Sequence, residues 1–174
     1  MSTGLTYAQV QKNLESLKLA QAQAALDRLA EEASKGSWSY VEFLGKLLDE
    51  EMAARQERRM SLRQRLAHFP WAKALDQFDF SFQPGLDRKK IRELAGMKFI
   101  QGAEVTIFTG PPGVGKTHLA IALGREATRV GDSVYFITLS ELADQVPLDR
   151  TDPRWAERLR VLSSPRLLIL DEVG

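Results

Sequence analysis

The chain has 174 residues, of which 44% are hydrophobic and 27% are charged, as in ordinary folded domains. Its 24 Lys and Arg residues nearly balance its 23 Asp and Glu residues, so the net charge of +1 gives no indication of a nucleic-acid partner. The absence of cysteine excludes disulfides, thiol catalysis and cysteine-ligated metals, and the two histidines are too few for a histidine metal cluster. No apolar run has the length of a membrane span or a signal peptide, which predicts a cytoplasmic protein with no membrane partner.

The first part of the chain has the pattern of helices. Apolar residues recur at three- and four-residue steps over residues 10–33, which predicts one face of a helix that Gly36 ends. Ser39 and Glu42 have the spacing of a capping box, so a further helix is expected to begin there and to reach about residue 67. Residues 1–69 are therefore predicted to form a small all-α domain.

Residues 70–102 are predicted to be a linker that contains one short helix. Within it, residues 77–84 alternate apolar and polar side chains, which fits a short strand. An extended connection whose three Phe residues pack into a neighbouring domain fits the same pattern. The short helix is expected over residues 86–99, with a strongly charged opening.

The pattern changes after Gly102. Compact apolar runs predict strands at residues 104–108, 133–137 and 166–170. Helices are expected at residues 116–129, which Gly131 closes, and at residues 152–162. Thr138 and Glu141 predict the start of one more helix. Strands that alternate with helices indicate an α/β fold with a parallel sheet covered on both faces, here over residues 103–174.

A glycine-rich loop follows the first of these strands. It matches the G-x-x-x-x-G-K-T phosphate-loop pattern at every position, with the residues Gly110, Pro111, Pro112, Gly113, Val114, Gly115, Lys116 and Thr117. Glycines let the backbone curl so that its N–H groups point at phosphate oxygens. Lys116 is expected to neutralise the phosphates of ATP, and the Thr117 hydroxyl is expected to coordinate Mg²⁺. The helix that begins at Lys116 would aim the positive end of its dipole at the same anion.

The last predicted strand ends in two carboxylates. The apolar run over residues 167–170 delivers Asp171 and Glu172 to the carboxyl edge of the sheet, where ligands bind in open parallel sheets. Asp171 is expected to hold Mg²⁺, directly or through water. Glu172 is expected to polarise the water that attacks the γ-phosphate, which makes Lys116 and Glu172 the candidate catalytic residues.

These motifs together resemble the AAA+ ATPases of the IstB/DnaC type. The resemblance rests on the loop continued by His118-Leu119-Ala120, on residues 134–138 and 170–174, and on the Phe69-Pro70-Trp71 linker with the residues that follow it. It extends over essentially the whole chain and implies a P-loop AAA+ fold. It also implies an ATP-dependent protein that oligomerises on double-stranded DNA and directs a partner transposase. Loading of a replicative helicase, as in DnaC, is the nearest alternative.

A basic helix is the candidate DNA contact. Residues 52–73 contain six basic residues and one acid, and the candidate phosphate ligands are Arg55, Arg58, Arg59, Arg63 and Arg65. Several of them step by four residues and so share a helix face. A solvated helix face, with Glu51 paired to Arg55, explains the same pattern. The resemblance favours contact with DNA or with the transposase.

The resemblance also implies that the ATPase domain is incomplete at its C-terminus. In the AAA+ arrangement, the strand at residues 104–108 would have no neighbour, and each unpaired hydrogen-bonding group buried there would cost about 1–3 kcal/mol. We therefore expect a poor ATPase that folds badly alone. In that case the chain would be a remnant that acts at most as a binding module.

Overall fold

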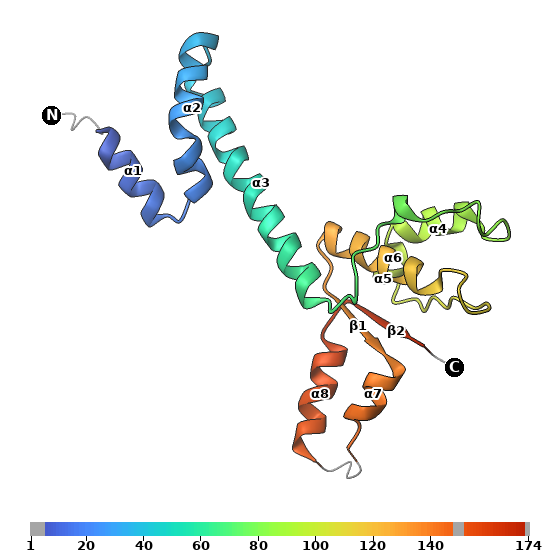
Figure 1. Cartoon of the computed structure of the whole chain (residues 1–174). Helices are drawn as coiled ribbons and strands as arrows, with labels where there is room; N and C mark the ends of the chain where they lie inside the picture. The colour runs from blue at the N-terminus through green and yellow to red at the C-terminus, as the bar shows by residue number, and fades with distance from the viewer. Residues whose placement is uncertain (1–5, 148–151, 173–174) are drawn as a thin grey trace. The chain divides into compact units, whose positions relative to one another are not determined.

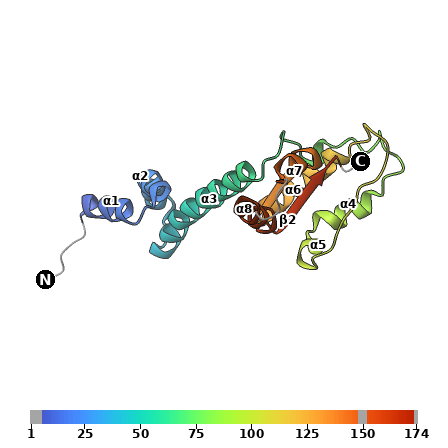
Figure 2. The same cartoon turned by 90° about the horizontal axis from the view of Figure 1, so that it is seen from below.

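The computed structural model describes residues 6–147 and 152–172. The chain divides into two compact units, Met1–Arg59 and Met60–Gly174. The division falls inside the longest helix, α3 (Tyr40–Leu66). Figures 1 and 2 trace the elements of each unit in chain order.

The first unit contains α1 (Tyr7–Ser16), α2 (Ala20–Gly36) and most of α3. The prediction of a single helix over residues 10–33 is wrong, because the chain turns at Lys18, whose φ is 57°. The turn gives α1 and α2 separate directions, so that apolar residues of both helices pack around one small core. The buried residues of this core are Ala22, Ala25, Leu26, Leu29 and Leu47.

The predicted boundary between α2 and α3 is confirmed. Gly36 is the last residue of α2, and Ser37 after it adopts a left-handed conformation with a φ of 51°. The Ser39 N–H donates to Glu42 Oε2 at 2.7 Å, and the Glu42 N–H donates to Ser39 Oγ at 3.2 Å. These reciprocal bonds satisfy amides that have no partner inside the helix, so α3 begins where the capping box predicts.

The linker contains a 3₁₀ turn, η1 (Leu75–Gln77), and two short helices, α4 (Arg88–Ala95) and α5 (Lys98–Gln101). One continuous helix over residues 86–99 is wrong, because Met97 has a φ of 58° and interrupts it. The predicted strand over residues 77–84 is also absent. The extended-connection interpretation holds for Phe78, which is buried, and not for Phe82, which is 70% exposed.

The remaining elements form the α/β part of the second unit. They are α6 (Lys116–Val130), β1 (Val134–Thr138), α7 (Leu139–Gln145), α8 (Pro153–Ser163) and β2 (Leu167–Asp171). The predicted parallel pairing is confirmed, with a register that runs from Val134 opposite Leu167 to Thr138 opposite Asp171. The left-handed Gly131 closes α6 as expected, and Thr138 and Glu141 form the predicted capping box of α7.

Residues 104–108 do not form the predicted strand. The only sheet in the described part of the chain is the pair β1–β2, and Val105 and Ile107 are 87% and 77% exposed. Because this segment faces water, its backbone groups can bond to solvent and the expected cost of burying them unpaired does not arise. Leu168 and Leu170 are also 38% and 44% exposed, so helices do not fully cover both faces of the sheet.

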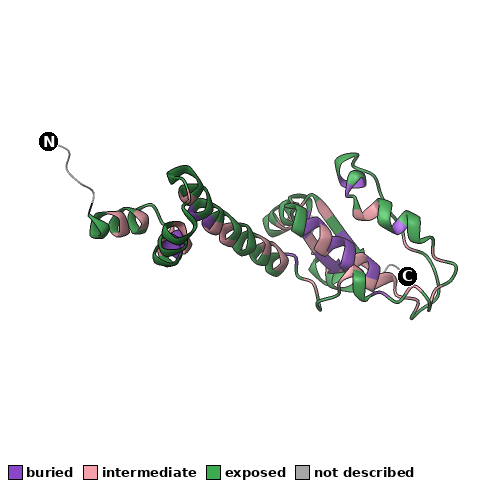
Figure 3. Cartoon of the chain, turned by 90° about the horizontal axis from the view of Figure 1, so that it is seen from above, coloured by how far each residue is buried: buried purple, intermediate pink, exposed green. Residues whose placement is uncertain are grey.

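The main core lies between α6 and the sheet, as the burial colours in Figure 3 show. It combines Ile121, Leu123 and Ala127 of α6 with residues of both strands. Gly124 makes the close approach possible, since a Cβ there would lie 2.7 Å from the Ile169 side chain. This packing fixes the N-terminal end of α6 beside the carboxyl end of β2, where the candidate site lies.

Candidate nucleotide site

The glycine-rich loop has a backbone that favours glycine at three positions. Gly110, Gly113 and Gly115 have φ values of 150°, 80° and 90°, and Gly115 is the N-cap residue of α6. A Cβ on Gly115 would lie 2.6 Å from the ring of Phe78, so this position is restricted by packing as well as by conformation. The loop therefore turns sharply into the first turn of α6, with the positive end of the helix dipole directed at the loop.

Lys116 lies across the loop. Its Nζ donates to the carbonyl oxygens of Gly110 at 2.8 Å and Pro111 at 2.9 Å. These contacts hold an ammonium group beside the curled backbone. A phosphate oxygen bound there could pair with the ammonium group and accept hydrogen bonds from the loop N–H groups.

A side chain from the first turn of α6 contacts a side chain at the end of β2, and both carry oxygen atoms. Thr117 Oγ1 donates to Asp171 Oδ1 at 3.0 Å, although the two residues are 54 positions apart. A hydroxyl and a carboxylate are hard oxygen donors of the kind that Mg²⁺ prefers. Among the described residues no group of three or more His, Cys, Asp or Glu could hold a metal alone. The pair therefore fits a Mg²⁺ ion that shares its coordination with nucleotide phosphates and water, which would neutralise phosphate charge.

Glu172 follows Asp171 at the edge of the sheet. It has a φ of 58° and is exposed, so its carboxylate is accessible to water. The positive φ marks the point where the chain leaves the extended geometry of β2. Asp171 and Glu172 thus differ in setting, since Asp171 bonds to Thr117 and Glu172 meets solvent.

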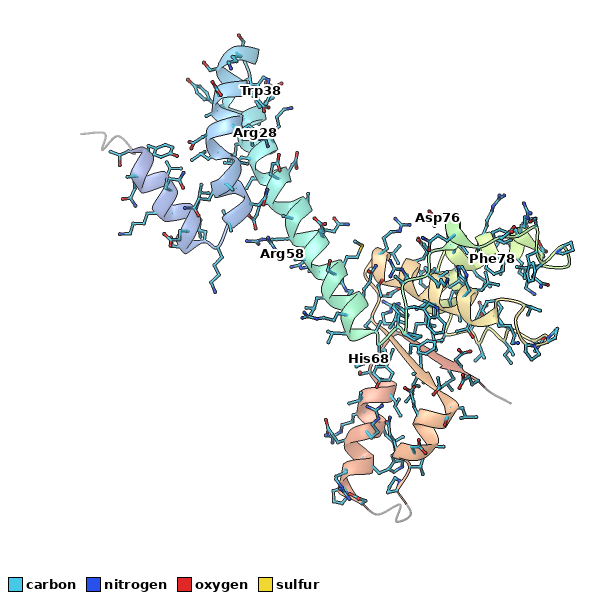
Figure 4. All side chains as sticks on the ribbon, in the orientation of Figure 1. Arg28, Trp38, Arg58, His68, Asp76 and Phe78 are labelled. Atoms are coloured by element: carbon cyan, nitrogen blue, oxygen red, sulfur yellow. The ribbon has the colours of Figure 1, made fainter. Side chains whose placement is uncertain are left out.

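The linker packs against the same turn of α6. His118 Nε2 lies 3.1 Å from the carbonyl oxygen of Ala74. The rings of Phe78 and His118 meet edge to face at 5.2 Å, and Phe78, labelled in Figure 4, also covers Gly115. Sequence reasoning missed the contact with Gly115. The only signal for it was the apolar alternation around Phe78.

In the basic helix, the first two candidate arginines are paired with a buried carboxylate. Arg55 Nε and Arg58 Nη2 lie 2.8 Å and 3.2 Å from Oε1 of Glu51, which is only 2% exposed. The Glu51–Arg55 pairing is thus present. The other oxygen of Glu51 accepts hydrogen bonds from the N–H groups of Gln21 at 2.8 Å and Ala22 at 3.3 Å. The arginines hold a carboxylate that caps α2 from a neighbouring helix.

The Arg55 guanidinium, helped by the two α2 amides, holds the pKa of Glu51 below its ordinary value even though burial acts in the opposite direction. The cap was missed by sequence reasoning. Its one sequence signal is that Leu19, the N-cap residue of α2, has no side-chain oxygen with which to cap the helix.

The other three candidate arginines do not bind Glu51. Arg59 and Arg65 are exposed and form no ion pair with any described residue. Arg63 Nη2 lies 4.0 Å from the position of a Cβ on Gly131, beside the negative end of the α6 dipole. The five predicted arginines therefore do not form one uniform set of free cations.

The geometry of the loop, its lysine and the Thr117–Asp171 pair is consistent with the P-loop class of nucleotide-binding proteins. A family model described as IstB-like ATP binding protein matches residues 12–174. The chain therefore belongs to the IstB-like ATP-binding protein family. No helix in the described ranges has the length and hydropathy needed to cross a bilayer.

Curated relatives agree with this assignment. A protein of Pseudomonas aeruginosa, named as a candidate ATP-binding protein of insertion sequence IS21, is 45% identical over 92% of this chain and 61% of its own length. The corresponding protein of insertion sequence IS5376 from Geobacillus stearothermophilus is 42% identical, over 84% of this chain and 58% of its own length. That of IS232 from Bacillus thuringiensis is 34% identical over 97% and 68%. The chain thus spans less than two thirds of the first two relatives.

Proposed function

We propose that this chain binds ATP with Mg²⁺ and serves as the nucleotide-binding part of a helper protein in DNA transposition. The contact between Thr117 and Asp171 carries the proposal, because it brings a hydroxyl and a carboxylate from distant parts of the chain to the mouth of the loop. Residues 110–117 would surround the phosphates, and Lys116 would move from the loop carbonyls to the β- and γ-phosphates.

Hydrolysis would require Glu172. An exposed carboxylate next to the Mg²⁺-binding aspartate is in a suitable place to accept a proton from the attacking water. Lys116 would stabilise the charge that develops on the transferred phosphoryl group.

The transposition context is supported by the relatives, which are named for insertion sequences. In this context the partners would be double-stranded DNA, a transposase and further copies of the same chain. Arg59 and Arg65 are the better candidates for DNA contact within the basic helix, because Arg55 and Arg58 are paired with a buried carboxylate.

A second candidate function is nucleotide binding without turnover. It is favoured by residues 104–108, which approach the loop without a strand partner in the described chain and with Val105 and Ile107 exposed. A loop whose entering segment is not held in a sheet has less of the preorganisation on which transition-state stabilisation depends.

Binding and hydrolysis of ATP by the purified chain test the proposal, with four variants for comparison. Lys116→Ala and Asp171→Asn should lower nucleotide affinity at least tenfold, whereas Glu172→Gln should bind normally and lose turnover. Lys35→Ala, which removes an exposed lysine in the first unit, is the matched control. Affinity unchanged in Lys116→Ala would refute the proposed site, and binding without turnover in the wild type would select the second candidate.

A further inference from the structure

Helix α4 presents a cationic surface that the nucleotide site does not use. The helix spans Arg88–Ala95, and the Asp87 carboxylate caps it by accepting hydrogen bonds from the N–H groups of Lys89 at 2.8 Å and Lys90 at 3.2 Å. Its inner side is apolar, with Ile91 only 3% exposed. Its solvent side carries only charged side chains, namely Arg88, Lys89, Lys90, Arg92 and Glu93.

The cations of this surface are weakly compensated within the chain. The one ion pair that they form among the described residues joins Lys89 Nζ to Glu93 Oε1 at 4.0 Å, between side chains that are 86% and 65% exposed. Such a pair contributes little in water. Arg92 lines an open groove that Asp76 and Glu126 also line, but Glu126 is paired with Arg129. The Lys90 ammonium forms no ion pair with any described residue.

One of the cations is held in place by an aromatic ring. The guanidinium carbon of Arg88 lies 5.1 Å from the centre of the Phe80 ring, within the range of a cation–π contact. Arg88 and Arg92 are four residues apart on one face, which places them about 6 Å apart along the helix axis. Several positive charges on the solvent side of one packed helix suit a partner that carries many negative charges close together.

The chemistry of the surface distinguishes between anionic partners. A stable protein interface needs an apolar centre, and the solvent side of α4 has no apolar side chain to supply one. Binding to a phosphate backbone needs only positive charge, because released counterions provide the driving force. Contacts of this kind position a protein on the duplex and do not read its sequence.

We propose that the solvent side of α4, through Arg88, Lys89, Lys90 and Arg92, binds the phosphate backbone of double-stranded DNA. This inference rests on the proposed function as a DNA-binding protein. It moves the principal contact from Arg59 and Arg65 of the basic helix to α4. It places DNA on the unit that also carries the nucleotide loop.

The salt dependence of DNA binding tests the proposal. Affinity of the full chain for a labelled random-sequence duplex would be measured over a range of salt concentrations, with ATP and Mg²⁺ present. The double variant Lys89→Gln/Lys90→Gln should reduce the slope of log affinity against log salt by about 2, because each missing lysine leaves one phosphate unneutralised. At low salt its affinity should fall about tenfold. The control Lys12→Gln/Lys35→Gln removes the same charge from the first unit and should change the slope by much less.

The possible outcomes separate this inference from the function on which it rests. A wild-type chain that does not bind duplex would refute DNA binding and this surface together. Normal binding by Lys89→Gln/Lys90→Gln, with loss in Arg59→Gln/Arg65→Gln, would overturn the α4 assignment and leave the proposed function intact. Equal competition by polyglutamate and by DNA at matched charge would overturn the assignment to nucleic acid. Unchanged melting temperature and nucleotide affinity of the double variant would confirm that the surface, rather than the fold, was altered.

Discussion

Glu51 shows how one side chain can decide the role of its neighbours. It is a buried carboxylate that accepts two α2 amides and two arginine side chains. Arginines that would otherwise be available to an external phosphate are thereby used inside the first unit. A buried acid with both oxygens satisfied is stable only while it remains ionised, because its partners are all donors.

We predict that the first unit loses stability in acid through Glu51. Its pKa is lowered by the hydrogen bond from Arg55, so the stabilisation is fully present above the ordinary pKa of 4.5 and is lost as the pH falls through the lower folded value. In Glu51→Gln this pH-dependent loss should be absent and the melting temperature at pH 7 should be lower by several degrees. Circular dichroism at a series of pH values measures both effects.

Glu31→Gln, which affects an ion pair between side chains that are 73% and 75% exposed, serves as the control. It should leave both the melting temperature and its pH dependence nearly unchanged. An identical acid transition in the wild type and in Glu51→Gln would contradict the assigned role of Glu51.

The loop glycines differ in a way that mutation can separate. We predict that Gly113→Ala costs about 1–2 kcal/mol through backbone strain alone, because no atom lies within 4 Å of the added Cβ. Gly115→Ala should cost more, since its Cβ also meets the Phe78 ring at 2.6 Å. In the Gly115→Ala background, Phe78→Leu should cost less than in the wild type, as measured by urea unfolding in a double-mutant cycle. Additive effects would show that Phe78 does not restrict Gly115.

At the scale of the element, replacing a helix glycine by alanine should have opposite effects on stability in α3 and α6. Gly45 has open space around it, whereas a Cβ on Gly124 would lie 2.7 Å from Ile169 Cδ1 and 2.9 Å from the Phe69 ring. We predict that Gly45→Ala stabilises the protein by about 1 kcal/mol through helix propensity. Gly124→Ala should destabilise it, because overpacking of about 1–3 kcal/mol exceeds the same gain. Denaturant unfolding curves give both values, and stabilisation by Gly124→Ala would mean that α6 can move away from β2.

At the scale of the whole molecule, the two units should respond differently to nucleotide. We predict that ATP with Mg²⁺ at about 100 times its dissociation constant adds about 2.7 kcal/mol to the stability of the second unit. Hydrogen exchange should slow at the amides of α6 and β2 and remain unchanged at those of α2. Slower exchange in α2 as well would show energetic coupling between the units, and no change in either would count against nucleotide binding.

Patterns that act over a few residues predicted the local structure well. The capping boxes at Ser39 and Thr138 and the closing Gly131 appear where the sequence places them, because each needs only neighbours three or four residues away. The turn at Lys18 and the break at Met97 were missed, since a periodic apolar pattern continues across both. The segment 104–108 has the composition of a strand, but a strand also needs a partner to accept its hydrogen bonds.

Residue type, spacing and the alternation of elements were enough to predict the phosphate-loop pattern, the carboxylates that follow the last strand and the parallel order of the two strands. Each of these can be recognised without knowing which distant residues meet. The tertiary structure was needed to establish that Thr117 meets Asp171, that Phe78 covers Gly115 and that a buried Glu51 pairs with Arg58 as well as with Arg55. The contacts of Thr117 with Asp171 and of Phe78 with Gly115 join residues that are far apart in the chain, and packing determines that they form.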